Sequence, residues 1–318
     1  MKLGIMIESQ EGVGWNEWKN IVQWTEDLGF ESLWRSDHLL ALSGATDSEV
    51  LSFWPSLTVV ATRSRRIRFG QLVSPVSFRD PMNLARNAVG LDLLSEGRFV
   101  LGVGAGWNER EHVAFGIPFP PVGQRMDMLD EAIQVIKLLW TGDPVSFAGK
   151  HFRLQDAQAR PTPSRPSGVP LIVAGKGEQR LLRMVAKYAD EWNYTGPMGE
   201  TYQGKADVLA KHCAAVQREP ASIMRSWMGG YMIARDAADL RRRSEKALAR
   251  DARLQGVSVE DVPAQLRERG MLVGTPDDVI TEIKAREAMG IERFMLQTLD
   301  LEDLGVLDTI AQEILPRV

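Results

Sequence analysis

The sequence predicts an α/β fold, a single (β/α)8 TIM barrel that spans residues 1–318 as one domain. Three observations lead to this prediction. Eight short apolar runs have the length of buried strands, a helical pattern follows each of them, and no break in composition divides the chain. Strands that alternate with helices favour parallel pairing and right-handed crossovers, and eight such units suit a closed barrel of this length.

The predicted strands are apolar along most of their length, as expected of strands that are buried on both faces. In chain order they cover residues 2–8, 30–34, 67–73, 99–101, 171–174, 191–194, 228–234 and 293–297.

The helices of the first half begin and end at residues that suit those positions. Trp15–Leu28 has apolar residues at helical spacing, and Gly29 follows it in the position that favours glycine. Another helix covers about 53–63. Asp80 can cap the helix before the fourth strand, where a proline in the first turn loses no hydrogen bond. Residues 125–140, after a long loop, repeat apolar side chains with a period near 3.6.

The second half continues the alternation with two additions. Val145–Leu154 is typical of a small hairpin, and four prolines in Gln158–Pro170 exclude regular structure there. The highly charged segment Arg241–Arg269 is read as a solvated helical insertion or lid before the last helix–strand unit. Further helices are predicted from the glycine turn at 175–177 to 189, from about 202, after Asp236, from Thr275 to Gly290, and over Leu301–Leu315.

Composition and charge exclude several classes of protein. A net charge of −4 gives no basic field for nucleic acid or an anionic membrane. We find no signal peptide and no apolar stretch of spanning length, and the single cysteine, Cys213, suits a reducing compartment. We therefore expect a cytoplasmic protein that acts on a small molecule. A zinc hydrolase is disfavoured because two of the four histidines lie in the hairpin and in mid-helix, away from the strand ends.

The stretch from Arg98 to Gln124 gives the first functional signal. After the apolar run of the fourth strand, glycines stand at 102, 104 and 106, where a missing Cβ lets a flat or anionic ligand approach the backbone. Trp107 adds a large aromatic surface. Asn108 and His112 are four residues apart and so share one face of a helical turn. The alternative is a glycine-rich loop that only turns a corner.

Polar residues also follow the second, third and fifth strands. Asp37 and His38 follow the second strand, Ser74 follows the third, and all would lie at the carboxyl end of the barrel, where such folds place their chemistry. His38 titrates near neutrality, which suits proton transfer, although it could instead only bond a carbonyl group. Gly175, Lys176 and Gly177, between a strand and a helix, suit a phosphate, and an ordinary turn is the alternative.

With these residues placed, the chain resembles the bacterial-luciferase-like flavin and deazaflavin oxidoreductases, and is closest to their coenzyme F420-dependent branch. The resemblance rests on LGFESLWRSDHLL, on the long segment 66–119, on LIVAGKGEQRLLRMVAKYADEWN and on the GTPDDV run, which occur in family order. The family's fold is a (β/α)8 barrel, in agreement with the strand count.

The resemblance implies roles at matching positions. His38 matches the proton-transferring histidine of the family. The region of the Val73–Ser74 and Ser74–Pro75 bonds matches a bulge, often with a cis peptide, behind the ring system, and the Ser74–Pro75 bond could be cis or have the usual trans form. The residues implied to contact the cofactor are Asp37, Val73, Ser74, Ala105, Gly106, Asn108 and His112 around the ring, and Gly175, Lys176 and Gly177 at the phosphate.

One departure bears on the substrate. Related sugar-phosphate dehydrogenases place a catalytic glutamate just after the Gly-x-Gly, where this chain has Trp107. We therefore place Trp107 in the substrate pocket and expect a more apolar substrate than a sugar phosphate. Two variable loops, Leu40–Ser52 and Arg241–Arg269, would shape specificity.

The expected activity is hydride transfer between coenzyme F420 and a small organic substrate, with His38 as proton donor or acceptor. A monooxygenase that uses reduced FMN and dioxygen is the first alternative, because both cofactors share a ring-and-phosphate outline. A flavin- or deazaflavin-binding protein without turnover is the second. The resemblance also implies a homodimer.

Overall fold

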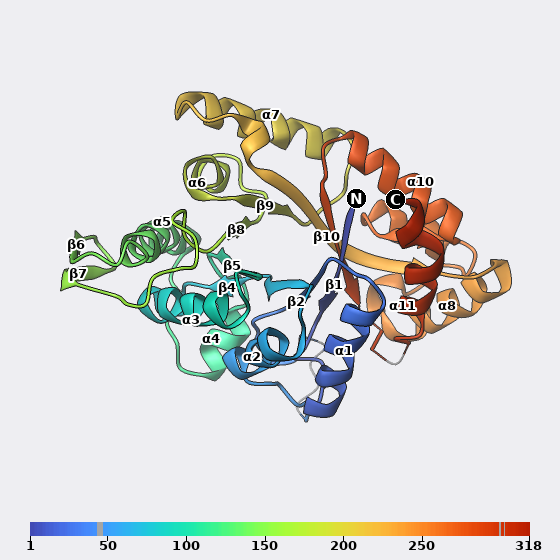
Figure 1. Ribbon diagram of the computed structural model, residues 1–318. Helices are drawn as coiled ribbons and strands as arrows, with labels where there is room; N and C mark the ends of the chain where they lie inside the picture. Colours follow the sequence, from blue (N-terminus) through green and yellow to red (C-terminus); the bar gives the residue numbers. More distant parts are fainter. Residues whose placement is uncertain (43–46, 299, 302) are drawn as a thin grey trace.

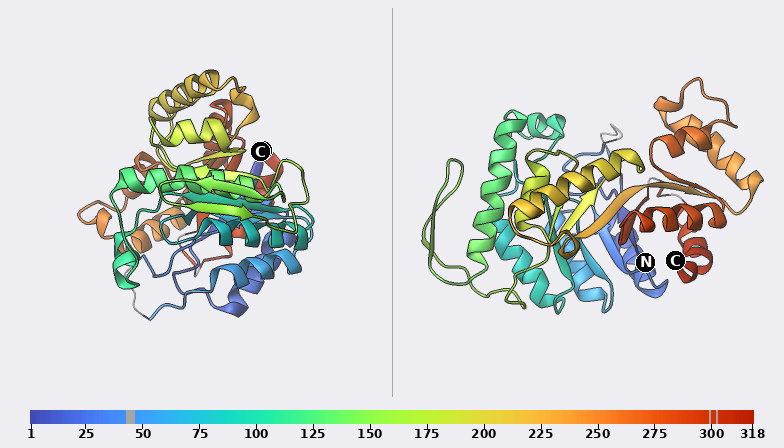
Figure 2. Two further views of the ribbon diagram at one scale, coloured as in Figure 1. Left: turned by 90° about the vertical axis from the view of Figure 1, so that its left-hand side faces the viewer. Right: turned by 90° about the horizontal axis from the view of Figure 1, so that it is seen from above.

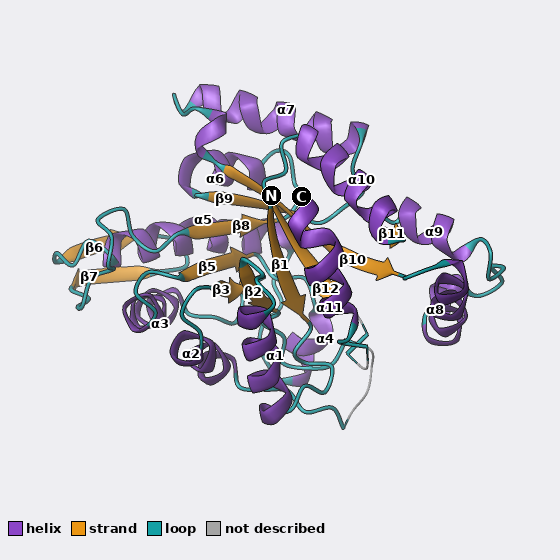
Figure 3. Cartoon of the chain, turned by 45° about the vertical axis from the view of Figure 1, so that its right-hand side comes forward, coloured by secondary structure: helices purple, strands orange, loops and turns teal. Residues whose placement is uncertain are grey.

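The computed structural model describes residues 1–42, 47–298, 300–301 and 303–318. Its central feature is a closed ring of parallel strands with helices on the outside (Figures 1 and 3). The ring consists of β1 (Lys2–Ile7), β2 (Ser32–Arg35), β3 (Arg68–Gln71) with β4 (Ser74–Pro75), β5 (Phe99–Gly104), β8 (Leu171–Ala174), β9 (Glu191–Tyr194), β10 (Met224–Ile233) and β12 (Arg293–Thr298). The pairing of β12 with β1 closes it, which confirms the predicted barrel.

All eight predicted strands are present, with small shifts in their bounds. Strand β10 begins at Met224, four residues before the predicted start, and its first half pairs with β9 and β12. Two strands of the described residues were not predicted: β4 lies just beyond the predicted third strand, which ended at Val73, and β11 (Leu272–Gly274) pairs with the far end of β10. Strand β11 lies outside the closed ring and follows the charged insertion Arg241–Arg269.

Alternation along the strands sends side chains to two different layers. In β1, Leu3, Ile5 and Ile7 join the large core between the strands and the helices. Met6 instead points into the barrel, where it meets Trp34 and four further side chains, Leu72, Val100, Ile172 and Met295. The interior is therefore a packed core rather than a channel, as is usual for eight-stranded barrels.

The helices around the barrel are α1 (Trp15–Asp27), α2 (Phe53–Arg63), α3 (Pro81–Leu94), α4 (Glu109–Ala114), α5 (Val122–Leu139), α6 (Leu181–Tyr188), α7 (Glu200–Ala215) and α10 (Pro276–Ala288). The caps predicted at Asp80 and Thr275 are confirmed: each side chain accepts a hydrogen bond from the backbone three residues on. Helix α5 begins three residues earlier than predicted, and α6 begins at Leu181 rather than beside the glycine turn.

The predicted final helix over Leu301–Leu315 is wrong in its start. The chain becomes helical at Val306 with α11 (Val306–Thr309) and then continues as a π-helical turn over Ile310–Ile314 and a short 3-10 turn. Residue 302 of the predicted helix lies outside the described residues. The C-terminus ends close to the N-terminus (Figures 1 and 2).

Two additions leave the barrel on opposite sides (Figure 3). The predicted hairpin is present as β6 (Val145–Ala148) and β7 (Arg153–Ala157). The charged insertion, together with the residues that flank it, forms what we call the lobe, made of α8 (Ala237–Arg250), a 3-10 turn (Ala252–Leu254), α9 (Val262–Glu268) and β11. The lobe has a small hydrophobic core of its own, built on Leu254, Val262, Leu266 and Val273. No helix among the described residues is long and apolar enough to cross a membrane.

Candidate active site

The predicted site residues gather at one end of the barrel. The strands β2, β3, β5 and β8 are consecutive neighbours in the ring, and all run parallel. Their carboxyl ends therefore meet at one rim. His38 follows β2, Ser74 lies just beyond β3, Ala105 directly follows β5, and Gly175 directly follows β8. The topology thus brings the four strand ends to one rim, and the expectation that they form one site stays a prediction.

His38 is held by a carboxylate that the sequence analysis did not single out. Its Nδ1 lies 3.0 Å from Oε2 of Glu111, a buried residue of α4. The other carboxylate oxygen, Oε1, accepts a hydrogen bond from the backbone N–H of Leu39. Glu111 therefore fixes both the ring of His38 and the backbone beside it. This pairing joins residues 73 positions apart in the chain.

The pair shifts the protonation of both partners. Burial alone would lower the pKa of His38, but the hydrogen bond and charge of Glu111, helped by Glu8 and Asp37, raise that pKa above its ordinary value. Burial would likewise raise the pKa of Glu111, yet His38 and the backbone N–H groups of Leu39 and Leu40 outweigh it and lower that pKa. The two shifts agree with an imidazolium–carboxylate pair, in which His38 holds its proton at a pH where an isolated histidine begins to lose it.

Trp107 stands beside this pair. Its ring meets the His38 ring edge to face, with centroids 5.7 Å apart, and its side chain is 67% exposed. An indole so exposed at a strand end leaves an aromatic surface next to the titrating nitrogen. The predicted role of Trp107 in the substrate pocket stays a prediction, and this position favours it.

Asp37 is buried and bonded within the chain. Arg79 Nη2 lies 2.6 Å from Oδ1 of Asp37, and Ser74 Oγ donates to Oδ2 at 2.7 Å. Both carboxylate oxygens thus have protein partners, which favours an orienting role for Asp37 and Ser74. The non-proline cis bond lies between Leu72 and Val73, not at the Val73–Ser74 or Ser74–Pro75 bond.

The glycines of β5 serve the fold before they serve a ligand. A Cβ at Gly102 would overlap the carbonyl oxygen of Gln71, and one at Gly104 would press on the Val73 side chain. Their absence lets the segment after β3 pack directly against β5. Ala105 and Gly106, one step further, are partly exposed on the rim, where contact with a cofactor stays a prediction.

His112 has a different place from the one expected. It is fully buried, with Nδ1 2.8 Å from the carbonyl oxygen of Asn108 and Nε2 2.9 Å from Oγ of Ser77. Phe78 and Phe119 flank its ring. Both nitrogens are therefore used within the protein, which favours a structural role for His112 over a polar contact to a cofactor. Asn108 is the N-cap residue of α4 and stays partly exposed.

The turn after β8 is held at its first residue and open beyond it. Gly175 donates its N–H to the Asn193 carbonyl at 3.1 Å and accepts from the Trp192 indole at 2.8 Å. Lys176 and Gly177 are exposed. An exposed ammonium group and glycine backbone at this rim have the chemistry that a phosphate group needs. No cluster of metal-binding residues is found in the part of the chain that the structure describes.

Comparison with known proteins assigns the family. The profile of the luciferase-like monooxygenases matches residues 1–293. The chain belongs to this family. It is an oxidoreductase, because its relatives are F420-dependent dehydrogenases and monooxygenases, and these relatives support the F420-dependent branch.

Three relatives of this luciferase-like enzyme illustrate the range of activities among the proteins that it resembles. It is 27% identical over 314 residues to the F420-dependent glucose-6-phosphate dehydrogenase of Amycolatopsis mediterranei, which covers 92% of this chain and 91% of that protein. It is 28% identical to the pyrimidine monooxygenase RutA of Allorhizobium ampelinum, over 79% and 67% of the two chains. An F420-dependent secondary alcohol dehydrogenase in complex with an F420-acetone adduct has a TM-score of 0.83 and 20% identity, covering 100% and 98%.

Sequence reasoning missed three residues of this site: Glu111, Arg79 and Glu8. Each acts on a residue that was predicted, since Glu111 and Glu8 influence His38 while Arg79 binds Asp37. Glu111 stands at a position that only the folded loop brings to His38. The signal that could have found it is the carboxylate one helical turn beyond Trp107, next to His112 in the sequence.

Proposed function

We propose that the enzyme transfers a hydride between coenzyme F420, a deazaflavin, and a small organic substrate, and that His38 moves the accompanying proton. The observation that carries this proposal is the His38–Glu111 pair, which lies on the same rim as the exposed turn at 175–177. That rim offers an aromatic face at Trp107 and a cationic, glycine-rich end at Lys176, as a planar ring with a phosphorylated tail requires. When bound, the deazaflavin would supply or accept the hydride.

The protein's own groups would then manage the proton. In the oxidation of an alcohol, for which the bound deazaflavin would supply the hydride acceptor, neutral His38 would take the proton of the hydroxyl group. In the reverse direction His38 starts as the imidazolium, which the Glu111 carboxylate stabilises. Asp37 holds Ser74 and Arg79 in place behind the site. The rim contacts expected of Val73, Ala105, Gly106 and Asn108 remain part of this proposal.

The first test is binding of the cofactor. Purified enzyme is titrated with F420 and, separately, with FMN, and the fluorescence of each is followed. We expect F420 to bind at least about tenfold more tightly, a difference of roughly 1.4 kcal/mol. Tight binding of FMN alone would instead favour the monooxygenase alternative, which the pyrimidine monooxygenase relative supports.

The second test is the replacement of His38. His38→Ala should leave F420 affinity unchanged and lower turnover by about 10²–10⁴-fold, the usual contribution of a general acid or base. Turnover is measured as reduction or reoxidation of F420 with the alcohol or ketone of a panel that the wild-type enzyme uses best. A fall below about threefold, with F420 still bound, would remove His38 from the reaction and favour a binding protein or another proton carrier. The homodimer and the cytoplasmic location implied by the resemblance stay predictions.

A further inference from the structure

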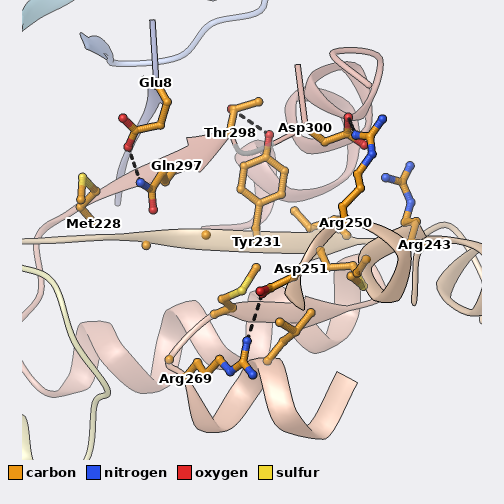
Figure 4. Close-up of a pocket in the computed structure, with 18 of the residues that line it drawn as sticks. Glu8, Met228, Tyr231, Arg243, Arg250, Asp251, Arg269, Gln297, Thr298 and Asp300 are labelled. Carbon is orange, nitrogen blue, oxygen red and sulfur yellow. Dashed lines mark hydrogen bonds and ion pairs between the residues drawn. The ribbon is translucent and has the colours of Figure 1, made fainter. Parts of the chain in front are cut away.

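A cavity of about 700 Å³ lies between the barrel and the lobe (Figure 4). The ends of β1, β9, β10 and β12 form its inner wall, and α8, the following turn and α9 form its outer wall. Together with β2, β3, β5 and β8, these four strands form the whole ring. Their carboxyl ends lie on the same rim as the strand ends that precede His38 and the glycine turn. A cavity of this size suits an organic ligand of moderate size.

The cavity reaches the segment that carries His38. Glu8 and Gln10 line it, and Gln10 accepts a hydrogen bond from Ser36, two residues before His38. Leu42, four residues after His38, also lines the cavity and donates its N–H to Glu11. The charge of Glu8 contributes to the raised pKa of His38. The cavity therefore approaches the segment that carries His38, whose side chain is not among its lining residues.

The cations of the outer wall are already engaged with carboxylates. Arg269 Nη1 lies 3.1 Å from Oδ2 of Asp251, which also binds Arg253. The remaining pairs of this wall are Arg243 with Asp303 and both Lys246 and Arg250 with Asp300. An anionic ligand would have to compete with these resident carboxylates, so the five cations do not mark a phosphate site.

The two acids on the barrel side of the cavity, Glu8 and Glu11, are engaged as well. Glu11 accepts hydrogen bonds from Leu42 N–H and the Gln10 amide. Glu8 is buried, and one of its carboxylate oxygens accepts a hydrogen bond from the side-chain amide of Gln297 (Figure 4). The other accepts from the side-chain amide of Gln10. A cationic ligand would find this carboxylate occupied. The charges on both walls therefore give little reason for a charged ligand to enter.

The uncharged lining includes thioether side chains and a pair of hydroxyl groups that are bonded to each other. Met228, Met232 and Met271 line the cavity with thioether chains, which adapt to irregular apolar ligands. Tyr231 OH lies 3.0 Å from Oγ1 of Thr298, and both face the cavity (Figure 4). In such a pair one hydrogen lies between the two oxygens and the second is free, so the pair can donate to a carbonyl or accept from a hydroxyl.

We propose that this cavity holds the substrate, and that the substrate is an uncharged molecule with an apolar body and one hydroxyl or carbonyl group. The assignment as substrate rests on the proposed function. Occupancy of the cavity can be measured without the cofactor, which keeps the two questions apart.

The test compares two probes of equal chain length, 2-nonanone and nonanoate, by calorimetry on the cofactor-free full-length enzyme at neutral pH. We expect 2-nonanone to bind at least about tenfold more tightly, because the carboxylate would lose its hydration without finding an unpaired cation. Met228→Arg, which puts a charge into the cavity, should weaken 2-nonanone by at least about tenfold. Met82→Arg, the same change on the exposed face of α3, should leave it unaltered.

Two further measurements guard against misfolding and a misassigned site. Met228→Arg should keep the F420 affinity of the wild type, because the proposed cofactor contacts lie at the ends of β2, β3, β5 and β8. Tyr231→Phe, which removes only a hydroxyl, should weaken 2-nonanone about two- to tenfold.

The proposal is overturned if nonanoate binds as tightly as 2-nonanone, or if Met228→Arg and Met82→Arg behave alike. It also fails if Met228→Arg loses F420 but keeps 2-nonanone, which would give the cavity to the cofactor. If Met228→Arg binds neither ligand, the result for Tyr231→Phe decides. An affinity of Tyr231→Phe for 2-nonanone that equals the wild-type value rejects the proposal. Binding of 2-nonanone by an enzyme that binds no F420 would reject the proposed function and leave the cavity's ligand class standing.

Discussion

The His38–Glu111 contact sets how the site responds to pH. The raised pKa of His38 means that this group stabilises the fold fully below about pH 6.5, its ordinary pKa, and loses that contribution as pH rises through the raised value. Glu111, whose pKa is lowered, contributes above its ordinary pKa and loses the contribution as pH falls through the lowered value. The ion pair is therefore complete between the lowered pKa of Glu111 and the raised pKa of His38.

Replacing Glu111 should move the titration of His38. In Glu111→Gln the charge that raises the His38 pKa is gone while the burial that lowers it remains, so the pKa should fall. The Cε1 proton of His38, followed by NMR from pH 5 to 9, reports this shift without any substrate. If His38 is the base in alcohol oxidation, the rising limb of the pH–rate profile should move to lower pH by the same amount.

Glu109→Gln is the matched control, because Glu109 is exposed on the same helix and carries the same charge. We expect the His38 titration to keep its wild-type midpoint in this variant. An equal shift in both variants would mean that the overall charge of α4, rather than the 3.0 Å contact, controls His38.

At the scale of single elements, a substitution at Gly102 of β5 can show whether this glycine is needed for packing or for binding a ligand. Gly102→Ala would push a methyl group into the Gln71 carbonyl oxygen, so β3 and β5 would have to part. We expect a loss of about 1–3 kcal/mol in the free energy of unfolding, the usual cost of overpacking. Gly90→Ala, in the middle of α3 with no atom near the added Cβ, should instead gain roughly 0.5–1 kcal/mol.

Equilibrium urea unfolding of the two variants, together with the F420 titration, tests this division. If Gly102→Ala kept wild-type stability but lost F420 binding, the packing role would be contradicted, because the glycine would then be needed for the ligand rather than for the fold.

The elements also show where sequence reasoning succeeds. Strands such as β1, β5 and β8 could be predicted because they are buried along most of their length, so their runs are largely apolar between turn residues. Strands β9 and β10 have weaker patterns, because β9 contains Glu191 and Asn193 and β10 is partly exposed. The caps at Asp80 and Thr275 could be predicted because they depend on neighbours three residues away. Strand β11 was missed because the lobe that contains it buries only a few apolar side chains among many charges, which hides its pattern.

Among the residues of the proposed site, too, those with a local signal in the sequence could be predicted and those that depend on distant partners could not. His38 and the glycine turn were found because they lie just after strands, and a parallel barrel brings the residues at its strand ends together. Glu111 and Arg79 were missed because their partners are distant in sequence and no periodicity marks them. The structural role that the structure favours for His112 could not be predicted for a related reason: Phe78, one of the two rings that flank it, is distant in sequence.

At the scale of the whole molecule, the two ends of the barrel have different roles, one in the proposed function and one in stability. The carboxyl end carries the site and the cavity. At the other end, Arg293, the first residue of β12, joins Glu191, the first residue of β9, and Glu31, which precedes β2. One side chain thus connects strands from three parts of the ring, above the interior core at Trp34.

Removing this guanidinium should destabilise the molecule strongly. Arg293 is 2% exposed, and Arg293→Met would leave the carboxylates of Glu191 and Glu31 without it, at a cost of about 3–5 kcal/mol of unfolding free energy. Arg68→Met is the matched control. Its side chain is 44% exposed and lies 3.9 Å from Glu31, so its loss should cost less than about 1 kcal/mol.

The double variant Arg293→Met with Glu191→Gln distinguishes charge from packing. If uncompensated charge causes the loss, neutralising Glu191 should restore a large part of the stability, since the amide keeps the shape of the carboxylate. All four proteins are compared by urea unfolding at pH 7, where both carboxylates are ionised in the unfolded chain. Equal losses in Arg293→Met and Arg68→Met, or no recovery in the double variant, would show that the charges at this end do not hold the ring together.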